Sequence, residues 1–323
     1  MTYNDADTVK ECVESVVRQD YPSRETIVVC DGGSSDGTEG RLRELQGAGP
    51  GRFELVTVPH TGRSAARNAG WMRGKGGVVF FADADDVYEL DYLTNAVRAI
   101  TGDNVGCVCV TGASLAEGSS LAQRMLKLYS ILQVKRRAAS GFNPSWAWVY
   151  TRKALEAAGG FDERLDQAED RDLFERVRKL GFEVAVVGGV HWFHRRPNTN
   201  AKYFKKTLKG GSSRIPYLAK RHDFIGFIRG TGIVWFICLA AAAQAFYPLA
   251  VVIFGAVLLA GLLYRGASTA SQVWGDVPRK LDLLIYPFFN LASHSVSAVG
   301  SLVGLARYVA YPPRRWSGNP PGG

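Results

Sequence analysis

The sequence contains little cysteine, with five among 323 residues and no CxxC pair. An odd number of cysteines without paired spacing excludes a disulfide scaffold and argues against a zinc framework. Cys107 and Cys109 would point to the same face of a strand, which disfavours a bond between them. We therefore expect the soluble part of the chain to lie in a reducing, cytosolic compartment.

Acidic residues are almost missing from the second part of the chain. Residues 195–323 hold 3 Asp and Glu against 16 Lys and Arg, whereas residues 1–194 hold 27 against 23. The net charge of +9 therefore comes entirely from the second part. Ten of its basic residues fall between positions 195 and 229, next to an apolar segment. Such a stretch is typical of a membrane flank, so we expect membrane lipids and no nucleic acid as its partner.

No charged residue occurs from position 230 to position 263, a run of 34 residues. About 20 apolar residues cross a bilayer, so the run predicts a hairpin of two spans that turns near residues 246–248. A buried hairpin in a soluble protein is the alternative, although soluble helices seldom run so long without a charge. Residues 281–311 form a third apolar stretch, interrupted by an Asn, a His and an Arg. This stretch either crosses the bilayer or lies along its surface.

These patterns predict how the chain is divided. The predicted parts are a soluble domain at 1–194, a basic juxtamembrane segment at 195–229, membrane helices at 230–311, with the hairpin at 230–263, and a tail at 312–323. Basic residues flank the predicted hairpin on both sides, so the positive-inside rule places the flanks and the soluble domain on the cytoplasmic side. We expect a multi-pass protein of the cell membrane.

Short β-branched or aromatic runs alternate with amphipathic helical patterns in the first 194 residues. Each run ends at Gly, Pro or Asp, as buried parallel strands do. Together they predict a Rossmann-like α/β sheet, mainly parallel, whose sites lie at the carboxyl ends of its strands. The predicted strands are 25–30, 52–58, 78–82 and 105–110, and helices at 7–19 and 91–100 separate them.

Two polar turns follow predicted strands. The first is Asp31-Gly-Gly-Ser-Ser-Asp-Gly-Thr38, whose glycines permit close backbone approach to a ligand and whose Asp31 can accept hydrogen bonds from a base. Its alternative interpretation is a helix N-cap formed by Asp36 or Thr38. The second is Asp83-Ala-Asp85-Asp86, where three carboxylates repel one another unless a cation lies among them. Hard oxygen ligands suit Mg²⁺ or Mn²⁺, and an exposed acidic turn is the alternative.

Six ordered segments extend this pattern across nearly 175 residues. They are Thr2-Tyr-Asn4, Cys30-Asp-Gly-Gly-Ser-Ser-Asp-Gly-Thr38, Gly62-Arg-Ser-Ala-Ala-Arg-Asn-Ala-Gly70, Phe81-Ala-Asp-Ala-Asp-Asp86, Gly159-Gly-Phe-Asp-Glu163 and Glu169-Asp-Arg-Asp-Leu173. Taken together they resemble glycosyltransferase family 2. That family consists of inverting, nucleotide-sugar-dependent enzymes with the A-type glycosyltransferase fold.

The resemblance implies roles for individual residues. Asp31 would hold the base, Arg63 would help to hold the nucleotide, Asp83 would lie near the ribose, Asp85 would bind the divalent cation on the diphosphate, and Asp170 would be the catalytic base. Further candidates are Tyr3 and Arg67 for the nucleotide sugar, Asp83 and His194 for the metal, and Glu169 beside the base. His194 has a structural histidine as its alternative.

The chemistry of sugar transfer fits these roles. A divalent cation stabilises the negative charge that builds on the leaving diphosphate. Inversion needs one carboxylate on the opposite face to take the proton of the acceptor hydroxyl. Asp170 begins a helical pattern in which Leu173, Phe174 and Val177 are expected to pack inward. The alternative for Asp170 is a carboxylate that only complements the helix dipole.

The acceptor is less clearly indicated. The Gln-x-x-Arg-Trp motif of processive synthases is absent, which favours transfer of a single sugar. Enzymes that load polyprenyl or dolichyl phosphate resemble this chain but usually continue the metal motif as Asp-Ala-Asp-Leu or Asp-Ala-Asp-Gly. The Asp-Ala-Asp-Asp at 83–86 therefore favours a lipid-linked glycan as the acceptor. Transfer to polyprenyl phosphate and a non-catalytic, membrane-anchored nucleotide-binding scaffold remain alternatives.

Two further expectations concern single elements. Relatives in the family begin with a buried strand before the Tyr-Asn turn, whereas this chain starts at Met1. Either the start lies upstream or the sheet is incomplete, and we expect the upstream start. Residues 120–138 place Leu121, Met125 and Leu132 at helical spacing and end in a basic triplet. We expect a helix there that rests on the membrane surface or packs into a core.

Overall fold

In the computed structural model the chain forms two compact units. The first unit includes Met1–Glu117 and Phe142–Arg196, and the second includes Gly118–Gly141 and Pro197–Trp316. The predicted boundaries at 194, 229 and 311 stay predictions. The structure describes residues 1–22, 24–31, 33–49, 53–60, 62–110, 120–139, 148–165, 167–188, 192–194, 199–213, 215–221, 225, 227–228, 231–232, 248–277 and 279–310.

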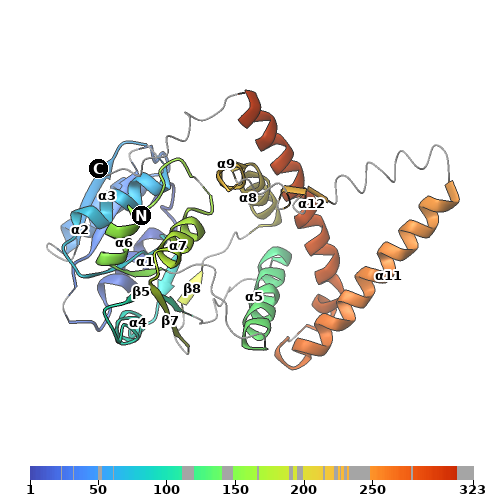
Figure 1. The fold of residues 1–323 in the computed structure, drawn as a ribbon, viewed down its shortest axis with the longest axis horizontal. Helices are drawn as coiled ribbons and strands as arrows, with labels where there is room; N and C mark the ends of the chain where they lie inside the picture. The colour runs from blue at the N-terminus through green and yellow to red at the C-terminus, as the bar shows by residue number, and fades with distance from the viewer. Residues whose placement is uncertain are drawn as a thin grey trace. The chain divides into compact units, whose positions relative to one another are not determined.

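The first unit is an α/β structure with parallel and antiparallel strand pairs (Figure 1). Its strands are β1 (Ile27–Asp31), β2 (Glu54–Val58), β3 (Val78–Phe80), β4 (Asp86–Tyr88), β5 (Val105–Val110), β6 (Val149–Thr151), β7 (Glu183–Val187) and β8 (Trp192–His194). β1 and β2 are parallel, as are β5 and β7. β6 lies between β3 and β5 and runs antiparallel to both, and β4 pairs antiparallel with β8. The four predicted strands are confirmed, and the antiparallel pairs are an addition to the expected parallel pattern.

Helices cover both faces of these strands. They are α1 (Val9–Val17), α2 (Thr38–Ala48), α3 (Arg63–Arg73), α4 (Tyr92–Arg98), α6 (Arg152–Ala158) and α7 (Glu169–Lys179). Cys107 and Cys109 pack with α6 and α7, whereas Val108 between them packs with Ala96 of α4. β5 is therefore buried on both faces, as its continuous apolar sequence indicates. The three buried cysteines that the structure describes are all free thiols, as expected.

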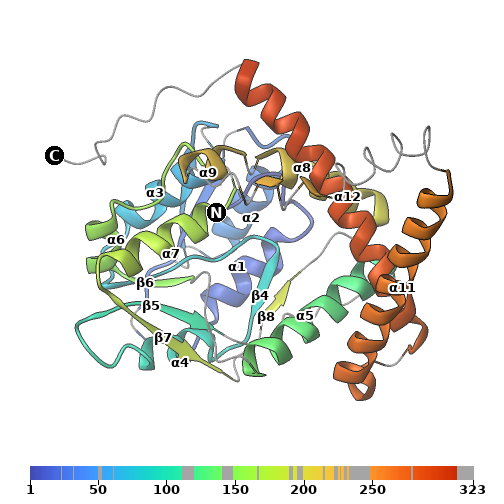
Figure 2. The ribbon, with the colours of Figure 1, turned by 45° about the vertical axis from the view of Figure 1, so that its right-hand side comes forward.

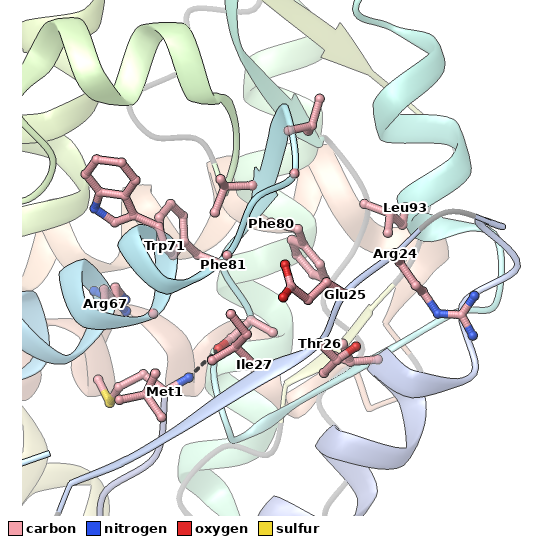
Figure 3. A pocket seen from close by; sticks show the side chains of 18 of the residues that line it. Met1, Arg24, Glu25, Thr26, Ile27, Arg67, Trp71, Phe80, Phe81 and Leu93 are labelled. Atoms are coloured by element: carbon pink, nitrogen blue, oxygen red, sulfur yellow. Dashed lines mark hydrogen bonds between the residues drawn. The ribbon is translucent and has the colours of Figure 1, made fainter. Parts of the chain in front are cut away.

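A cavity of about 200 Å³ separates β1 from β3 (Figure 3). Ile27 of β1 lines one side, and Phe80 and Phe81 line the other. Met1 lies at one end, where its amino group donates to the Ala82 carbonyl at 3.3 Å. The Thr2 N–H donates to the Val29 carbonyl of β1 at 2.9 Å, so the first residues already pair with β1. The expected upstream start stays a prediction.

The second unit consists of helices. They are α5 (Leu121–Ala139), α8 (Asn200–Ser213), α9 (Ile215–Lys220), α11 (Pro248–Val273), the 3-10 helix η1 (Trp274–Asp276) and α12 (Leu281–Ala310). Met125 and Leu132 of α5 are buried with Val273 and Leu283 from the α11 and α12 region. Arg124 of α5 also forms an ion pair with Asp282 at 3.1 Å. The packing alternative for residues 120–138 is thus confirmed, while the side chains of the basic triplet 135–137 lie outside the described residues.

Helices α8 and α12 pack so closely that their backbones nearly touch (Figure 2). A Cβ atom on Gly300 would lie 2.2 Å from the Leu208 carbonyl oxygen, and one on Gly304 would lie 2.3 Å from that of Ser212. The Ser301 hydroxyl adds a hydrogen bond to the Gly211 carbonyl at 3.3 Å. Small residues at four-residue spacing permit this approach.

The predicted membrane segments are described only in part. Within the described part of the chain, α12 is the one helix that is long and apolar enough to cross a membrane, by length and composition. α11 begins at Pro248, next to the predicted turn, and continues ten residues beyond the apolar run, which ended at Leu263. Serine, threonine, alanine and glutamine in that extension are compatible with helix, so loss of apolar character does not end it. Residues 233–247, and with them the first predicted span, lie outside the described residues.

Candidate active site

The acidic turn, residues 83–86, follows β3 and is held by hydrogen bonds from two other elements. The Tyr88 hydroxyl accepts from the Asp83 N–H and donates to the Asp86 carboxylate, each at 3.2 Å. The Cys12 thiol of α1 donates to the Asp83 carbonyl at 3.2 Å. Because Asp86 and Tyr88 are buried, these bonds fix the backbone of the turn. Asp85 is half-buried between the two anchored residues.

Arg67 of α3 connects this turn to α7. Its Nη2 donates to Asp83 Oδ1 at 2.8 Å and its Nη1 donates to Glu169 Oε1 at 2.6 Å. Arg67 is 4% exposed and Glu169 is 3% exposed, so this ion pair is almost fully removed from water. The rings of Trp148 and Phe161 lie 5.3 and 5.4 Å from the guanidinium carbon. Two carboxylates and two aromatic rings therefore surround one cation.

The electrostatics of Asp83 and of Asp170, the neighbour of Glu169, differ. Burial alone would raise the pKa of Asp83, but the charge and hydrogen bond of Arg67 outweigh it and lower that pKa. Burial raises the pKa of Asp170, and the neighbouring Glu169 charge raises it further. Asp83 thus stays ionised at low pH, whereas the carboxylate of Asp170 becomes a stronger base. Such a separation between neighbouring groups is typical of acid–base sites.

Asp170 lies in the first turn of α7, as its helical pattern predicts. Leu173, Phe174 and Val177 are buried in the core on the face opposite solvent, which confirms the expected packing. Asp170 itself is half-buried, and its carboxylate accepts the Arg171 N–H at 2.7 Å. A hydrogen bond to the backbone and a packed helix turn give the carboxylate a defined position.

The segment 159–163 is attached to α3 by Asn68. The Asn68 side chain donates to the Phe161 carbonyl at 2.9 Å and accepts the Phe161 N–H at 2.9 Å. Gly160 has a φ of +67°, and a Cβ there would lie 2.7 Å from the Asn68 side-chain oxygen. Glycine is therefore required for both the conformation and the space. Asn68 was not singled out from the sequence, although it lies within the segment 62–70.

The Tyr-Asn turn is attached to the Asp31 loop, residues 31–38. The Asn4 side chain accepts the Ser35 N–H at 2.8 Å, and the Asp5 N–H donates to the Thr38 hydroxyl at 2.9 Å. Asp36 accepts the Thr38 N–H at 3.0 Å, but the N-cap of α2 is Gly37 and has no side-chain cap hydrogen bond, so the alternative of an N-cap formed by Asp36 or Thr38 is wrong. Asp31 ends β1, opposite Val58 of β2, and its side chain lies outside the described residues.

Tyr3 stacks on His60 with 4.8 Å between ring centroids. The two rings lie beyond the carboxyl ends of β1 and β2, the edge at which the Asp31 loop begins. His60 was not a sequence candidate, because a histidine two residues after a strand carries no signal by itself. Arg63 at the start of α3 is 43% exposed at its side chain, and its Nη1 is 3.4 Å from Glu169.

Asp5 was also missed by the sequence analysis. Burial raises its pKa, and the nearby charge of Asp85 contributes to the increase. Asp5 and Asp85 therefore lie close enough to repel, although they are 80 positions apart. Among the residues that the structure describes, no group of three or more His, Cys, Asp or Glu is arranged to hold a metal. His194 is the backbone partner of Asp86 in the β4–β8 pair, and its side chain lies outside the described residues.

Comparison with known proteins identifies relatives of this chain. Residues 1–159 match the sequence model of Glycosyl transferase family 2. Glycosyltransferase AglE of Haloferax volcanii is 25% identical over 216 residues, which cover 66% of this chain and 70% of that protein. An N-acetylglucosaminyltransferase of Azorhizobium caulinodans is 33% identical over 228 residues, which cover 66% of this chain and 57% of that protein.

A solved structure has the same fold. It is the mannosyltransferase PcManGT from Pyrobaculum calidifontis in complex with GDP-Man and Mn²⁺. The two structures superpose with a TM-score of 0.63 at 22% identity, over 93% of this chain and 85% of that chain. The similarity confirms the expected A-type glycosyltransferase fold.

Proposed function

We propose a reaction for this protein from the premise that it is a nucleotide-sugar-dependent glycosyltransferase with a Glycosyl transferase family 2 domain in residues 1–159. The proposed reaction moves a single sugar, with inversion, from a nucleotide sugar to an acceptor hydroxyl. It uses a divalent cation, and the acceptor is a lipid-linked glycan.

The observation that carries this proposal is the convergence of the acidic turn and the start of α7 on Arg67. The turn supplies Asp83 and Asp85 on the donor side, and α7 supplies Asp170. Inverting transfer needs this pair of functions, a held diphosphate and a base, in one place. The raised pKa of Asp170 supports attack by a hydroxyl, because a phosphate acceptor needs no strong base. A scaffold without activity would need neither group.

The oxygen donors of the acidic turn fit a divalent cation. Mg²⁺ and Mn²⁺ are commonly held by one or two carboxylates together with substrate phosphates, so three protein ligands are not required. Asp85 is the proposed ligand, with Asp83 and His194 as further candidates on the same turn and its partner strand. When bound, the cation would stabilise charge on the departing diphosphate. PcManGT was solved with Mn²⁺, which supports the proposal by analogy of fold.

Helix α12 supports attachment of the second unit to a membrane. It exposes apolar side chains along its whole length, including Leu284, Phe288, Val299 and Val303. α8 packs on it in parallel, since Leu208 meets Gly300 and Ser212 meets Gly304. The exposed lysines of α8 are Lys202, Lys205, Lys206 and Lys209.

We propose that α12 lies along the membrane surface. If it crossed the bilayer, the tightly packed α8 would carry its lysines into the hydrocarbon, at a cost of about 2.5–3.5 kcal/mol for each one at the centre. At the surface, the same lysines attract anionic headgroups and the apolar stripe enters the acyl region. The 230–263 hairpin, the multi-pass topology and the cytoplasmic side of the first unit are proposed from the sequence pattern. A surface attachment would hold the protein at the membrane that carries a lipid-linked acceptor.

A donor panel tests the proposed reaction. Purified membranes containing the protein are given each common nucleotide sugar with Mn²⁺, and release of nucleoside diphosphate is measured with and without lipid extract. We expect one donor to be turned over faster when lipid is present. Turnover of no donor in the presence of Mn²⁺ and lipid contradicts the proposal.

A further inference from the structure

Arg67 has its hydrogen-bonding groups directed at the protein. Its two terminal nitrogens donate to Glu169 and Asp83, at 2.6 and 2.8 Å. The rings of Trp148 and Phe161 lie beside the guanidinium, and 4% of the residue is exposed. A diphosphate would have to displace one of these buried carboxylates in order to form a bidentate contact.

Arg63, one helical turn earlier on α3, is arranged differently. Its side chain is 43% exposed, and its Nη1 is 3.4 Å from Glu169. The two arginines share Glu169 as a partner, but only Arg67 also reaches Asp83. Arg63 is thus an exposed cation that is open to a ligand, whereas Arg67 is enclosed by the protein.

We infer that Arg67 is a positioning residue that fixes the first turn of α7, and with it Asp170, at a set distance from the acidic turn. It acts through Glu169 and Asp83 and does not bind the donor. The inference rests on the proposed function, in which Asp170 is the base and the acidic turn holds the donor diphosphate.

The charges give a physical reason for this role. Asp83 and Glu169 would repel each other inside the protein without the cation between them, and the first turn of α7 would move away from the turn. A shift of about 1 Å in a reacting group can lower turnover by about 10²-fold. Burial and the charge of Glu169 raise the pKa of Asp170, and the charge of Arg67 opposes this increase.

The test compares Arg67→Met, Arg67→Lys, Glu169→Gln and the double variant Arg67→Met/Glu169→Gln in the full-length protein, with Arg63→Met as the matched control. We measure kcat with the donor found in the panel, and the dissociation constants of UDP and GDP with Mn²⁺. Arg67→Met is expected to lower kcat by about 10²-fold and to change nucleotide affinity by less than about threefold. The control is expected to weaken nucleotide binding more than it lowers kcat.

Two readouts separate positioning from general damage to the fold. The acidic limb of the kcat–pH profile should move to higher pH in Arg67→Met and stay in place in Arg67→Lys, which keeps the charge. The double variant should lose no more turnover than the worse single variant, because both changes act on the same turn of α7. The double variant also removes the buried charge of Glu169, which Arg67→Met leaves without its partner. We therefore expect the double variant to fold even if Arg67→Met is too unstable to assay.

Three results would overturn the inference. They are loss of nucleotide affinity in Arg67→Met with kcat unchanged, turnover losses that multiply in the double variant, and a pH profile that does not move in Arg67→Met. A parent protein that turns over no nucleotide sugar contradicts the proposed function instead. That outcome is seen before any variant is compared.

Discussion

Asp85 is the residue on which the proposed metal dependence rests. It lies between Asp83 and Asp86, whose positions are fixed by hydrogen bonds, and close to Asp5. We expect Asp85→Ala to abolish transfer and to remove the dependence of UDP or GDP affinity on Mn²⁺, because the diphosphate loses its cation. Titration calorimetry with and without Mn²⁺ measures this. An affinity that does not depend on Mn²⁺ in the parent would contradict the assignment.

Glu169 allows the environment of the base to be tested by pH. Its charge is, after burial, the main cause that raises the pKa of Asp170. Turnover should therefore be present above that pKa and be lost as the pH falls through it, at a pH above the usual Asp value of about 3.9. In Glu169→Gln the acidic limb should move to lower pH, whereas the control Glu156→Gln, at an exposed position of α6, leaves it unchanged. A limb that moves upward or stays in Glu169→Gln would argue against Asp170 as the base.

At the scale of elements, Gly160 tests how the segment 159–163 is attached to α3. A Cβ on Gly160 would meet Asn68 at 2.7 Å, whereas one on Gly159, which also has a positive φ, would meet nothing within 4 Å. Gly160→Ala should lower the free energy of unfolding by about 2–4 kcal/mol through strain and crowding, and Gly159→Ala by about 1–2 kcal/mol through strain alone. Urea unfolding of both variants checks the difference. Equal losses would mean that the contact with Asn68 contributes nothing.

The elements of the first unit follow closely from local sequence patterns. β1, β2, β3 and β5 are β-branched runs, and α1, α4 and α7 have apolar residues at helical spacing. β4, β6, β7 and β8 were not among the predicted strands. The antiparallel direction of β6 depends on a partner strand more than 40 positions away in β5, which no local pattern contains.

The candidate site was predicted as a set of segments but not as a set of contacts. The sequence placed Asp83, Asp85 and Asp170 after strands or at a helix start, and the structure has them there. It could not show that Arg67 is buried between two carboxylates, because a charged residue in a helix is usually on the surface. Asp5 and His60 could not be found from the sequence either, because their neighbours Asp85 and Tyr3 are brought close to them only by folding.

At the scale of the whole molecule, the orientation of α12 can be decided by labelling its two ends. Leu281 is 65% exposed and Val309 is 72% exposed. Single cysteines are placed at these two positions, one per variant, in a cysteine-free background. If α12 lies on the cytoplasmic surface, an impermeant reagent labels both positions in inverted membrane vesicles and neither in intact cells. A helix that spans the bilayer exposes one of them in intact cells instead. Cysteine at position 247, in the predicted translocated turn, serves as the control that labels in intact cells.

The central claim is that Asp170 removes the proton of the acceptor hydroxyl in a metal-dependent sugar transfer. The most direct measurement compares the parent with Asp170→Asn, which keeps the shape of the side chain and removes the base. Turnover with the donor and acceptor from the panel, and binding of UDP and GDP with Mn²⁺, are measured on the same samples. We predict a fall in kcat of about 10²–10⁴-fold with nucleotide affinity unchanged. A variant that keeps near-parental turnover would contradict the account, because another group would then be the base.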